Sequence, residues 1–280
     1  MKKKIKFIAL DLDDTFLDDE KGIPKENELA VGEAIEKGVY VVVSTGRSLT
    51  AIPMKDINRM GVQYAITANG AEIHKLPEQE VVFSDGMEPS FACEIIEKMQ
   101  ELQVHTTVFI EGICFADKRD LPRVDELKLS DVMKDYMRAS RTYVDDLITL
   151  VKEKNKAIQK FTLQFYYNNG KYWNYDKTYE LLKNDKRICL VTGGYHNLEF
   201  SKYGVSKGTS LCFLANKLGI DLEQTMACGD TQNDIDILQT AGIGVAVANA
   251  TEDVKAAADY ITLSNNESGV AHAIRKFVLD

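Results

Sequence analysis

The chain has 280 residues, of which 45% are hydrophobic and 28% charged, so it is long enough for a large core and for two domains. Its 34 basic and 43 acidic residues give a net charge of −9, which excludes a bulk affinity for nucleic acid or for an anionic membrane. An anionic ligand would have to be attracted locally.

The first residues carry lysines, and the apolar run that follows, Phe7–Leu10, has only four residues before Asp11. A secretory signal peptide needs an apolar region of roughly 7 to 15 residues, and a membrane span needs about 20. The five cysteines are scattered and none forms a C-x-x-C pair. We therefore expect a cytoplasmic chain with reduced thiols and no membrane partner.

Short continuous apolar runs predict strands that are buried on both faces, at residues 5–10, 39–44, 64–67 and 243–247. Such strands are typical of a parallel sheet covered by helices. Predicted helices alternate with them: residues 25–37 end at Gly38 and residues 207–218 end at Gly219, where glycine favours a helix C-terminus. This alternation predicts an α/β fold with a doubly wound, Rossmann-like parallel sheet.

The middle of the chain follows a different pattern. Residues 104–117 read as a hairpin that turns at Glu111–Gly112. Residues 159–167 alternate, with Phe161 and Leu163 on one face and polar side chains on the other. Half-exposed antiparallel strands with interspersed helices predict a separate α+β domain.

We place this α+β domain at residues 84–193, inserted into a core formed by residues 1–83 and 194–280. The joins would lie in two segments rich in turn-forming residues, 84–89 and 192–194.

Two acidic clusters follow predicted strands of the core. Asp11 and Asp13 come after the first strand, and Asp230 and Asp234 come after a second strand and a glycine. In a doubly wound sheet functional groups collect at the carboxyl ends of the strands, so the clusters are expected to converge. Several carboxylates that converge without a cation would have to take up protons. Oxygen ligands without a nearby His or Cys favour Mg²⁺, which commonly binds a substrate phosphate as well.

Two further segments indicate an oxyanion site. Ser44, Thr45 and Gly46 come at another strand end, where hydroxyl and amide groups can bind an anion. Lys207 opens a helix, so a fixed cation and the positive helix end coincide. An anion held between Mg²⁺ and a lysine is what a transferring phosphoryl group requires.

The segments DLDDT, STGR, SKG and GDTQND occur in this order and in the expected strand and helix contexts. Together they resemble the four motifs of the haloacid dehalogenase-like (HAD) superfamily. They are most similar to the Cof-type phosphatases, whose C2B-type cap is inserted between the second and third core motifs. The resemblance covers the core at both ends, about 170 residues, and reaches the middle domain by position and strand pattern only.

The resemblance implies a catalytic role for four residues. Asp11 would be the nucleophile that forms an aspartyl-phosphate. Asp13 would protonate the leaving group and then activate water. Thr45 would hold the phosphoryl oxygens, and Lys207 would neutralise charge on Asp11 and the phosphate.

The resemblance also implies a metal site and a substrate site. Asp11, the backbone carbonyl of Asp13, and Asp230 would bind Mg²⁺, with Asp234 completing or orienting the shell. The residues expected to contact substrate are Gly46, Arg47, Asn69, Gly70 and Asn233.

Several of these residues have simpler interpretations. Arg47 is as well explained by pairing with an acid as by binding substrate. Asn69–Gly70 would form a tight turn in any case, and Asn249 favours a structural role. Asp14 is expected in a solvated loop. The basic residues of the insert are expected to be solvated rather than to bind substrate.

We expect a Mg²⁺-dependent phosphatase that acts on a small phosphorylated metabolite, a sugar phosphate or a phosphorylated cofactor, with no nucleic acid partner. The presence of Asp13 argues against dehalogenation, because the dehalogenating branch lacks that second carboxylate and the metal. Two alternatives stay open: a phosphomutase acting on sugar phosphates, and a non-catalytic phospho-acceptor or ligand-binding module. The sequence does not predict the natural substrate, the preferred divalent metal, or whether the protein is a monomer or a dimer.

Overall fold

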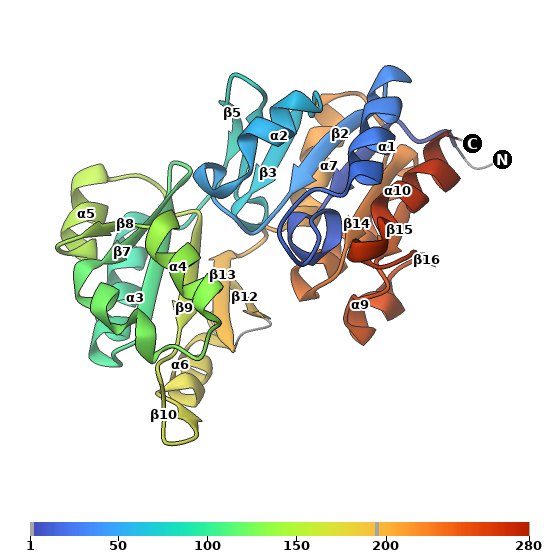
Figure 1. The fold of residues 1–280 in the computed structure, drawn as a ribbon. Coiled ribbons are helices and arrows are strands. Elements are labelled where there is room, and N and C mark those ends of the chain that lie inside the picture. Colours follow the sequence, from blue (N-terminus) through green and yellow to red (C-terminus); the bar gives the residue numbers. More distant parts are fainter. Residues whose placement is uncertain (1–2, 194–195, 280) are drawn as a thin grey trace. The chain divides into compact units, whose positions relative to one another are not determined.

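The computed structural model describes residues 3–193 and 196–279, and the chain divides into two compact units (Figure 1). Unit 1 comprises Met1–Arg47, Ile52–Phe83 and Ser206–Asp280, and unit 2 comprises Ser48–Ala51 and Ser84–Val205. Across residues 3–193 and 196–279, no helix combines the length and the apolar character that crossing a membrane would need.

Unit 1 is built on an eight-stranded sheet. Its strands, in the order in which they lie side by side, are β16 (Tyr260–Ile261), β15 (Ile243–Ala246), β14 (Thr225–Gly229), β1 (Phe7–Leu10), β2 (Tyr40–Ser44), β3 (Tyr64–Thr67), β4 (Glu72–Lys75) and β5 (Glu80–Ser84). The strands from β16 to β3 are parallel, and β4 runs antiparallel to β3.

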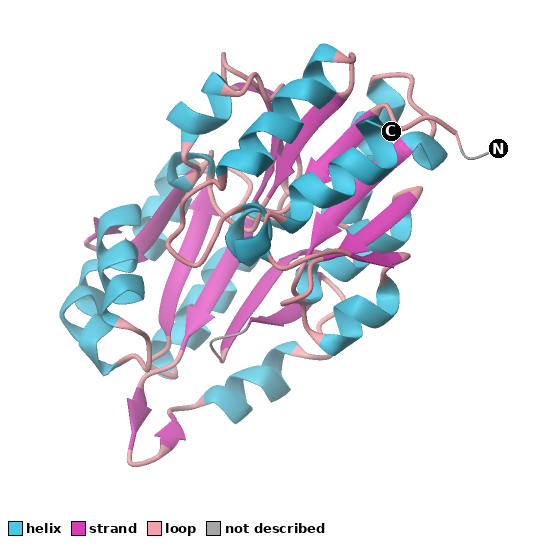
Figure 2. Ribbon diagram, turned by 45° about the vertical axis from the view of Figure 1, so that its right-hand side comes forward, coloured by secondary structure: helices cyan, strands magenta, loops and turns pink. Residues whose placement is uncertain are grey.

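Helices cover both faces of this sheet (Figure 2). They are α1 (Lys25–Glu36), α2 (Met54–Arg59), α7 (Lys207–Lys217), α8 (Ile235–Thr240), α9 (Glu252–Ala257) and α10 (Gly269–Ile274). Phe7 and Ala9 of β1 pack in one apolar cluster with Leu211 of α7 and Ile237 of α8. The intervening residues of β1 point to the opposite face, where α1 and α10 pack against each other. The predicted α/β class with a parallel, doubly wound core is therefore confirmed.

The strand register decides where the site forms. Leu10, the last residue of β1, lies beside Val43 of β2 and Cys228 of β14. The residues that follow these strands therefore emerge at one edge of the sheet. Asp11 is the first of them, and its amide donates to the Cys228 carbonyl at 3.0 Å.

Unit 2 contains a six-stranded sheet and a short hairpin. The sheet order is β12 (Ile188–Gly193), β13 (Asn197–Lys202), β9 (Lys160–Gln164), β6 (His105–Ile110), β7 (Ile113–Asp117) and β8 (Thr142–Val144), and the hairpin pairs β10 (Tyr167–Asn168) with β11 (Lys171–Tyr172). All neighbouring strands of the sheet are antiparallel except β7 and β8. The helices are α3 (Pro89–Glu101), α4 (Asp131–Ser140), α5 (Leu147–Lys154) and α6 (Tyr175–Leu182).

The hairpin predicted in residues 104–117 is confirmed. β6 and β7 pair up to Ile110 and Ile113, and both turn residues, Glu111 and Gly112, have positive φ, as a two-residue turn requires. The expectation of half-exposed strands is wrong for β6, all six residues of which are buried. β6 is a central strand, flanked by β9 and β7.

The division between the units differs from the predicted boundary at 193/194. Unit 2 continues to Val205, because β13 pairs with β12 and β9 and so completes the sheet of unit 2. Residues 48–51 also group with unit 2, and the Thr50 amide donates to the Gly112 carbonyl. Gly194, part of the predicted second join, lies outside the described residues.

Candidate active site

A buried lysine joins the acids of unit 1. Lys207 Nζ donates to Asp11 Oδ1 at 2.6 Å and to Asp234 Oδ1 at 2.7 Å. Lys207 is only 1% exposed, so both ion pairs are shielded from water. Burial disfavours the ammonium ion, but the two carboxylates outweigh it and raise the pKa of Lys207. Lys207 therefore remains charged.

The start of helix α7 holds Lys207 in place. Ser206 caps the helix through the Thr209 amide, in a reciprocal arrangement with the Thr209 side chain. Gly70 has a φ of +103° and lies so close to this turn that a Cβ there would come within 2.0 Å of the Ser206 carbonyl oxygen. The Gly70 carbonyl accepts a hydrogen bond from Ser210 Oγ at 2.5 Å. Gly70 thus positions the lysine-bearing helix through close backbone packing.

Asp11, Asp230 and Asp234 form an acidic triad in which one carboxylate oxygen from each residue lies within 4.8 Å of the others. All three residues are buried. Burial, reinforced by Asp234, raises the pKa of Asp230 to about 7. Burial also raises the pKa of Asp11, and Lys207 opposes that shift. Three buried carboxylates with one lysine leave a deficit of positive charge.

The turn after β14 fixes the triad locally. The amides of Asp230 and Thr231 both donate to Asp234 Oδ2 at 3.2 Å. A Cβ at Gly229 would come within 2.4 Å of the Asp234 Cβ, so glycine lets this turn close tightly. Asp230 also accepts a hydrogen bond from Thr15 Oγ1 at 2.9 Å. The structure therefore brings Asp230 and Asp234 together in one turn.

The triad fits a hard divalent cation. Its potential ligands are carboxylate oxygens, with no His or Cys in the group, and Mg²⁺ prefers oxygen ligands of this kind. A bound cation would also balance the excess of negative charge, which a single lysine does not.

Asp13 is not part of the triad, and its carboxylate forms a two-point ion pair with Arg47. Arg47 Nε donates to Asp13 Oδ2 at 2.8 Å, and a terminal nitrogen of Arg47 donates to Oδ1 at 2.6 Å. Lys21 Nζ lies 3.4 Å from Asp13 Oδ1 and 2.7 Å from Asp14 Oδ1. Burial opposes ionisation of Asp13, but Arg47 and Lys21 outweigh it and lower the pKa of Asp13. In this conformation Arg47 pairs with an acid, one of its two predicted roles.

The predicted phosphate-binding segment lies at the same edge of the sheet. Thr45 is buried, and its Oγ1 accepts from the Arg47 amide at 3.1 Å, which leaves the hydroxyl hydrogen available for another acceptor. Gly46 follows it and is partly buried. Ser44 Oγ and Thr67 Oγ1, at the ends of β2 and β3, are buried and have no hydrogen-bond partner among the described residues. This edge thus carries hydroxyl groups suited to an oxyanion.

Asn69 and Asn233, both predicted to contact substrate, are hydrogen-bonded to each other. Asn233 Nδ2 donates to Asn69 Oδ1 at 3.0 Å, although Asn69 follows β3 and Asn233 follows β14. Asn69 is buried and adopts the left-handed conformation that asparagine tolerates. Asn249 has the structural role that the sequence favours, because its side chain donates to the Asp14 carbonyl and accepts from the Asn265 amide.

Sequence reasoning missed three residues of this region. Thr15 orients Asp230, Lys21 pairs with Asp13 and Asp14, and Asp236 accepts from Ser206 Oγ. Thr15 had a usable signal, because it ends the segment DLDDT that also contains Asp11. Lys21 and Asp236 had none, since each contact depends on how a loop or a helix lies in three dimensions.

Comparison with known proteins agrees with this geometry. A family model described as haloacid dehalogenase-like hydrolase matches residues 8–274. Phosphatase YwpJ of Bacillus subtilis is 34% identical, over 97% of this chain and 99% of its own length. A second Bacillus subtilis protein, 5-amino-6-(5-phospho-D-ribitylamino)uracil phosphatase YcsE, is 33% identical over 98% of this chain and 96% of its own.

A solved structure, a haloacid dehalogenase-like hydrolase from B. subtilis, superimposes with a TM-score of 0.85 at 30% identity. It covers 98% of this chain and 100% of its own. Fold, family model and full-length relatives therefore agree. The chain belongs to the haloacid dehalogenase-like hydrolase superfamily, as a Cof-type phosphatase, and is a phosphoric monoester hydrolase.

Proposed function

We propose that the protein hydrolyses a small phosphorylated metabolite through an aspartyl-phosphate on Asp11, in a reaction that depends on Mg²⁺. The observation that carries the proposal is the pairing of Asp11 with Lys207 inside a triad of buried carboxylates. One oxygen of Asp11 is held by a cation at 2.6 Å, which favours the ionised, nucleophilic form of this side chain.

In the first step a carboxylate oxygen of Asp11 attacks phosphorus, and the bond from phosphorus to the leaving oxygen breaks. For this step Asp13 has to be protonated, against the direction in which Arg47 and Lys21 shift its pKa in this conformation. It then gives its proton to that leaving oxygen, so the alcohol departs neutral. Lys207 and the Thr45 hydroxyl stabilise the charge on the phosphoryl oxygens. Arg47 positions Asp13 through its two hydrogen bonds.

In the second step the Asp13 carboxylate takes a proton from water, and the water oxygen attacks the phosphorus of the aspartyl-phosphate. The bond between phosphorus and the Asp11 oxygen breaks. Inorganic phosphate leaves, and both aspartates return to their initial forms. Asp13 thus serves as acid and then as base.

The metal would be held by the carboxylates of Asp11 and Asp230 and by the backbone carbonyl of Asp13. Asp234 would orient the others, since its two oxygens already accept from Lys207 and from the amides of Asp230 and Thr231. A bound Mg²⁺ supplies charge stabilisation for the phosphoryl group.

The names of the relatives support a small-metabolite substrate. YcsE is named for a phosphoribitylaminouracil, and YbhA of Escherichia coli, 27% identical over 95% of this chain, is named a pyridoxal phosphate phosphatase. We therefore favour sugar phosphates, phosphorylated polyol compounds and phosphorylated cofactors as substrates. Gly46, Asn69, Gly70 and Asn233 are proposed to contact the substrate.

The test is phosphate release from a panel that contains hexose and pentose phosphates, pyridoxal phosphate, FMN and p-nitrophenyl phosphate. It is run with Mg²⁺ and with EDTA, for the wild type, for Asp11→Asn, and for the control Asp221→Asn, whose side chain is 69% exposed. We expect turnover that requires metal, is abolished in Asp11→Asn and is unchanged in the control.

Equal release by the wild type and Asp11→Asn would overturn the assignment of the nucleophile. Interconversion of sugar phosphates with little free phosphate, stimulated by a bisphosphate, would overturn hydrolysis in favour of a mutase.

A further inference from the structure

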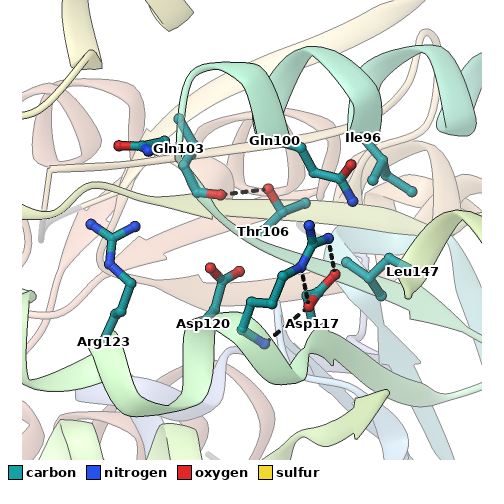
Figure 3. A pocket seen from close by; sticks show the side chains of 10 residues that line it. Ile96, Gln100, Gln103, Thr106, Asp117, Asp120, Arg123 and Leu147 are labelled. Atoms are coloured by element: carbon teal, nitrogen blue, oxygen red, sulfur yellow. Dashed lines mark hydrogen bonds and ion pairs between the residues drawn. The ribbon is translucent and has the colours of Figure 1, made fainter. Parts of the chain in front are cut away.

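Unit 2 contains a cavity of about 200 Å³ that includes none of the residues of the acidic triad (Figure 3). It lies between α3, the start of α5, strands β6 and β7, and the helical turns at Lys118–Glu126. Ile96, Val104 and Leu147 give it an apolar wall, while charged and amide side chains line the rest.

Asp120 brings to this cavity a carboxyl group that has no direct ion pair among the described residues. Its carboxylate accepts from the Tyr166 hydroxyl at 2.8 Å. The two arginines beside it make their ion pairs with other acids. Arg119 donates from Nε and a terminal nitrogen to the Asp117 carboxylate, and Arg123 donates from the same two kinds of nitrogen to the Glu126 carboxylate. Burial raises the pKa of Asp120, and Asp117 adds to this effect, while the Tyr166 hydroxyl, the Thr106 backbone and the charge of Arg123 oppose it without cancelling it. A cationic ligand group beside Asp120 would give this carboxyl a direct ion pair and favour its ionised form.

The same cavity also offers unused hydrogen-bond donors. Gln100 Nε2 is buried and has no partner among the described residues. Arg119 uses Nε and one terminal nitrogen on Asp117, and its other terminal nitrogen donates no hydrogen bond to any residue that the structure describes. Figure 3 shows Gln100, Asp117 and Asp120 among the side chains that line this cavity. These donors suit a carboxylate.

The cavity therefore offers a carboxyl group for a cation and N–H donors for an anion, beside an apolar wall. Its volume lies below the roughly 300 to 1,000 Å³ of pockets that hold drug-sized ligands. We propose that this cavity binds a free α-amino acid, with the ammonium group on Asp120 and the carboxylate on Gln100 and Arg119. This site goes beyond the phosphatase activity and does not depend on the proposed mechanism.

The experiment is calorimetric titration of the full chain, without any phosphorylated substrate, using the standard L-α-amino acids one at a time. For each amino acid that binds, two one-ended analogues are titrated: the amine that lacks the carboxylate and the acid that lacks the amine. The variants are Asp120→Asn and Gln100→Met. The matched control is Asp125→Asn, the same substitution on the same segment, where the side chain is 73% exposed and pairs with Arg138.

We expect at least one amino acid to bind with a Kd of about 1 mM or lower, and each one-ended analogue to bind at least about tenfold more weakly. Asp120→Asn should weaken binding by about tenfold or more, while Asp125→Asn should not. Gln100→Met provides a second reading if Asp120→Asn fails to fold. The proposal is overturned if no amino acid binds at concentrations up to about 10 mM, or if both cavity variants bind as the control does. Because binding is read without turnover, failure here leaves the phosphatase proposal intact, and the reverse also holds.

Discussion

Lys207 Nζ lies 2.6 Å from Asp11 Oδ1, although the two residues are 196 positions apart in the chain. The pair exists because β1 and the N-terminus of α7 meet at one edge of the sheet, where Gly70 packs against the first turn of α7. The same ammonium group also binds Asp234, so one side chain joins three segments. This contact is central to both the stability of the edge and the proposed chemistry.

Replacement of Lys207 by methionine should damage both properties. Two buried carboxylates would lose their cation, and breaking a buried ion pair by removing one partner costs about 3–5 kcal/mol. We expect a loss of this size in the free energy of unfolding, measured in urea, together with a fall in kcat of about a hundredfold or more. Lys217→Met, the same change at an exposed position of the same helix, should alter neither. An active Lys207→Met variant of wild-type stability would contradict the arrangement.

Thr15→Val should weaken metal binding and leave the chemical step intact. Thr15 is fully buried and donates to Asp230 Oδ1, and such supporting contacts are worth about 10- to 100-fold in metal affinity. The Mg²⁺ concentration for half-maximal activity should rise by about tenfold or more, with kcat at saturating Mg²⁺ largely retained. Thr178→Val, also fully buried but bonded to its own helix, is the control. If kcat fell and the metal dependence did not change, Thr15 would have a different role.

The fold of unit 1 was predictable because its signals are local. The runs at 39–44 and 64–67 become β2 and β3, and the helix expected at 25–37 becomes α1, which ends one residue earlier. Each prediction rests on apolar continuity or on a terminal glycine, and tertiary packing only trims the ends. The site residues were likewise placed at strand ends, and a doubly wound sheet brings strand ends together.

Side-chain partners and the boundary of the insert were harder to predict. β13 (Asn197–Lys202) comes shortly before the core motif at Lys207 in the chain, yet it pairs with its neighbour β9 in the sheet of unit 2. Strand pairing between distant segments leaves no mark in either segment alone. Lys21 shows the same limitation, because its position opposite Asp13 depends on a loop in which Lys21 itself has a positive φ.

Arg47→Met should impair substrates with poor leaving groups most. Arg47 holds Asp13 through two hydrogen bonds, and general acid catalysis contributes about 10²- to 10⁴-fold when the leaving oxygen needs a proton. We expect kcat/KM for an alkyl phosphate to fall by about tenfold or more, whereas kcat/KM for p-nitrophenyl phosphate, whose leaving group departs as a stable anion, should change far less. Arg59→Met removes an exposed arginine of the same unit and should affect neither substrate. Equal losses on both substrates would indicate that Arg47 binds the phosphoryl group instead.

His105 should make the stability of the protein depend on pH. It is completely buried in β6, and burial, reinforced by the charges of Arg141 and Arg123, lowers its pKa to about 3. In the unfolded chain a histidine titrates near pH 6.5, so the unfolded state takes up a proton below that pH while the folded state does not until about pH 3. Acid therefore favours unfolding, and this residue should cost the wild type about 2 kcal/mol of unfolding free energy between pH 7 and pH 5.

In His105→Gln that component is absent, so the difference in unfolding free energy between variant and wild type should shift by this amount in favour of the variant. Urea denaturation at pH 8, 7, 6 and 5 measures it, and the interval from pH 8 to pH 7, where the imidazole is neutral in both states, is the internal control. A difference that stays constant from pH 8 to pH 5 would show that His105 titrates in the fold as it does in the unfolded chain, as an imidazole open to solvent would.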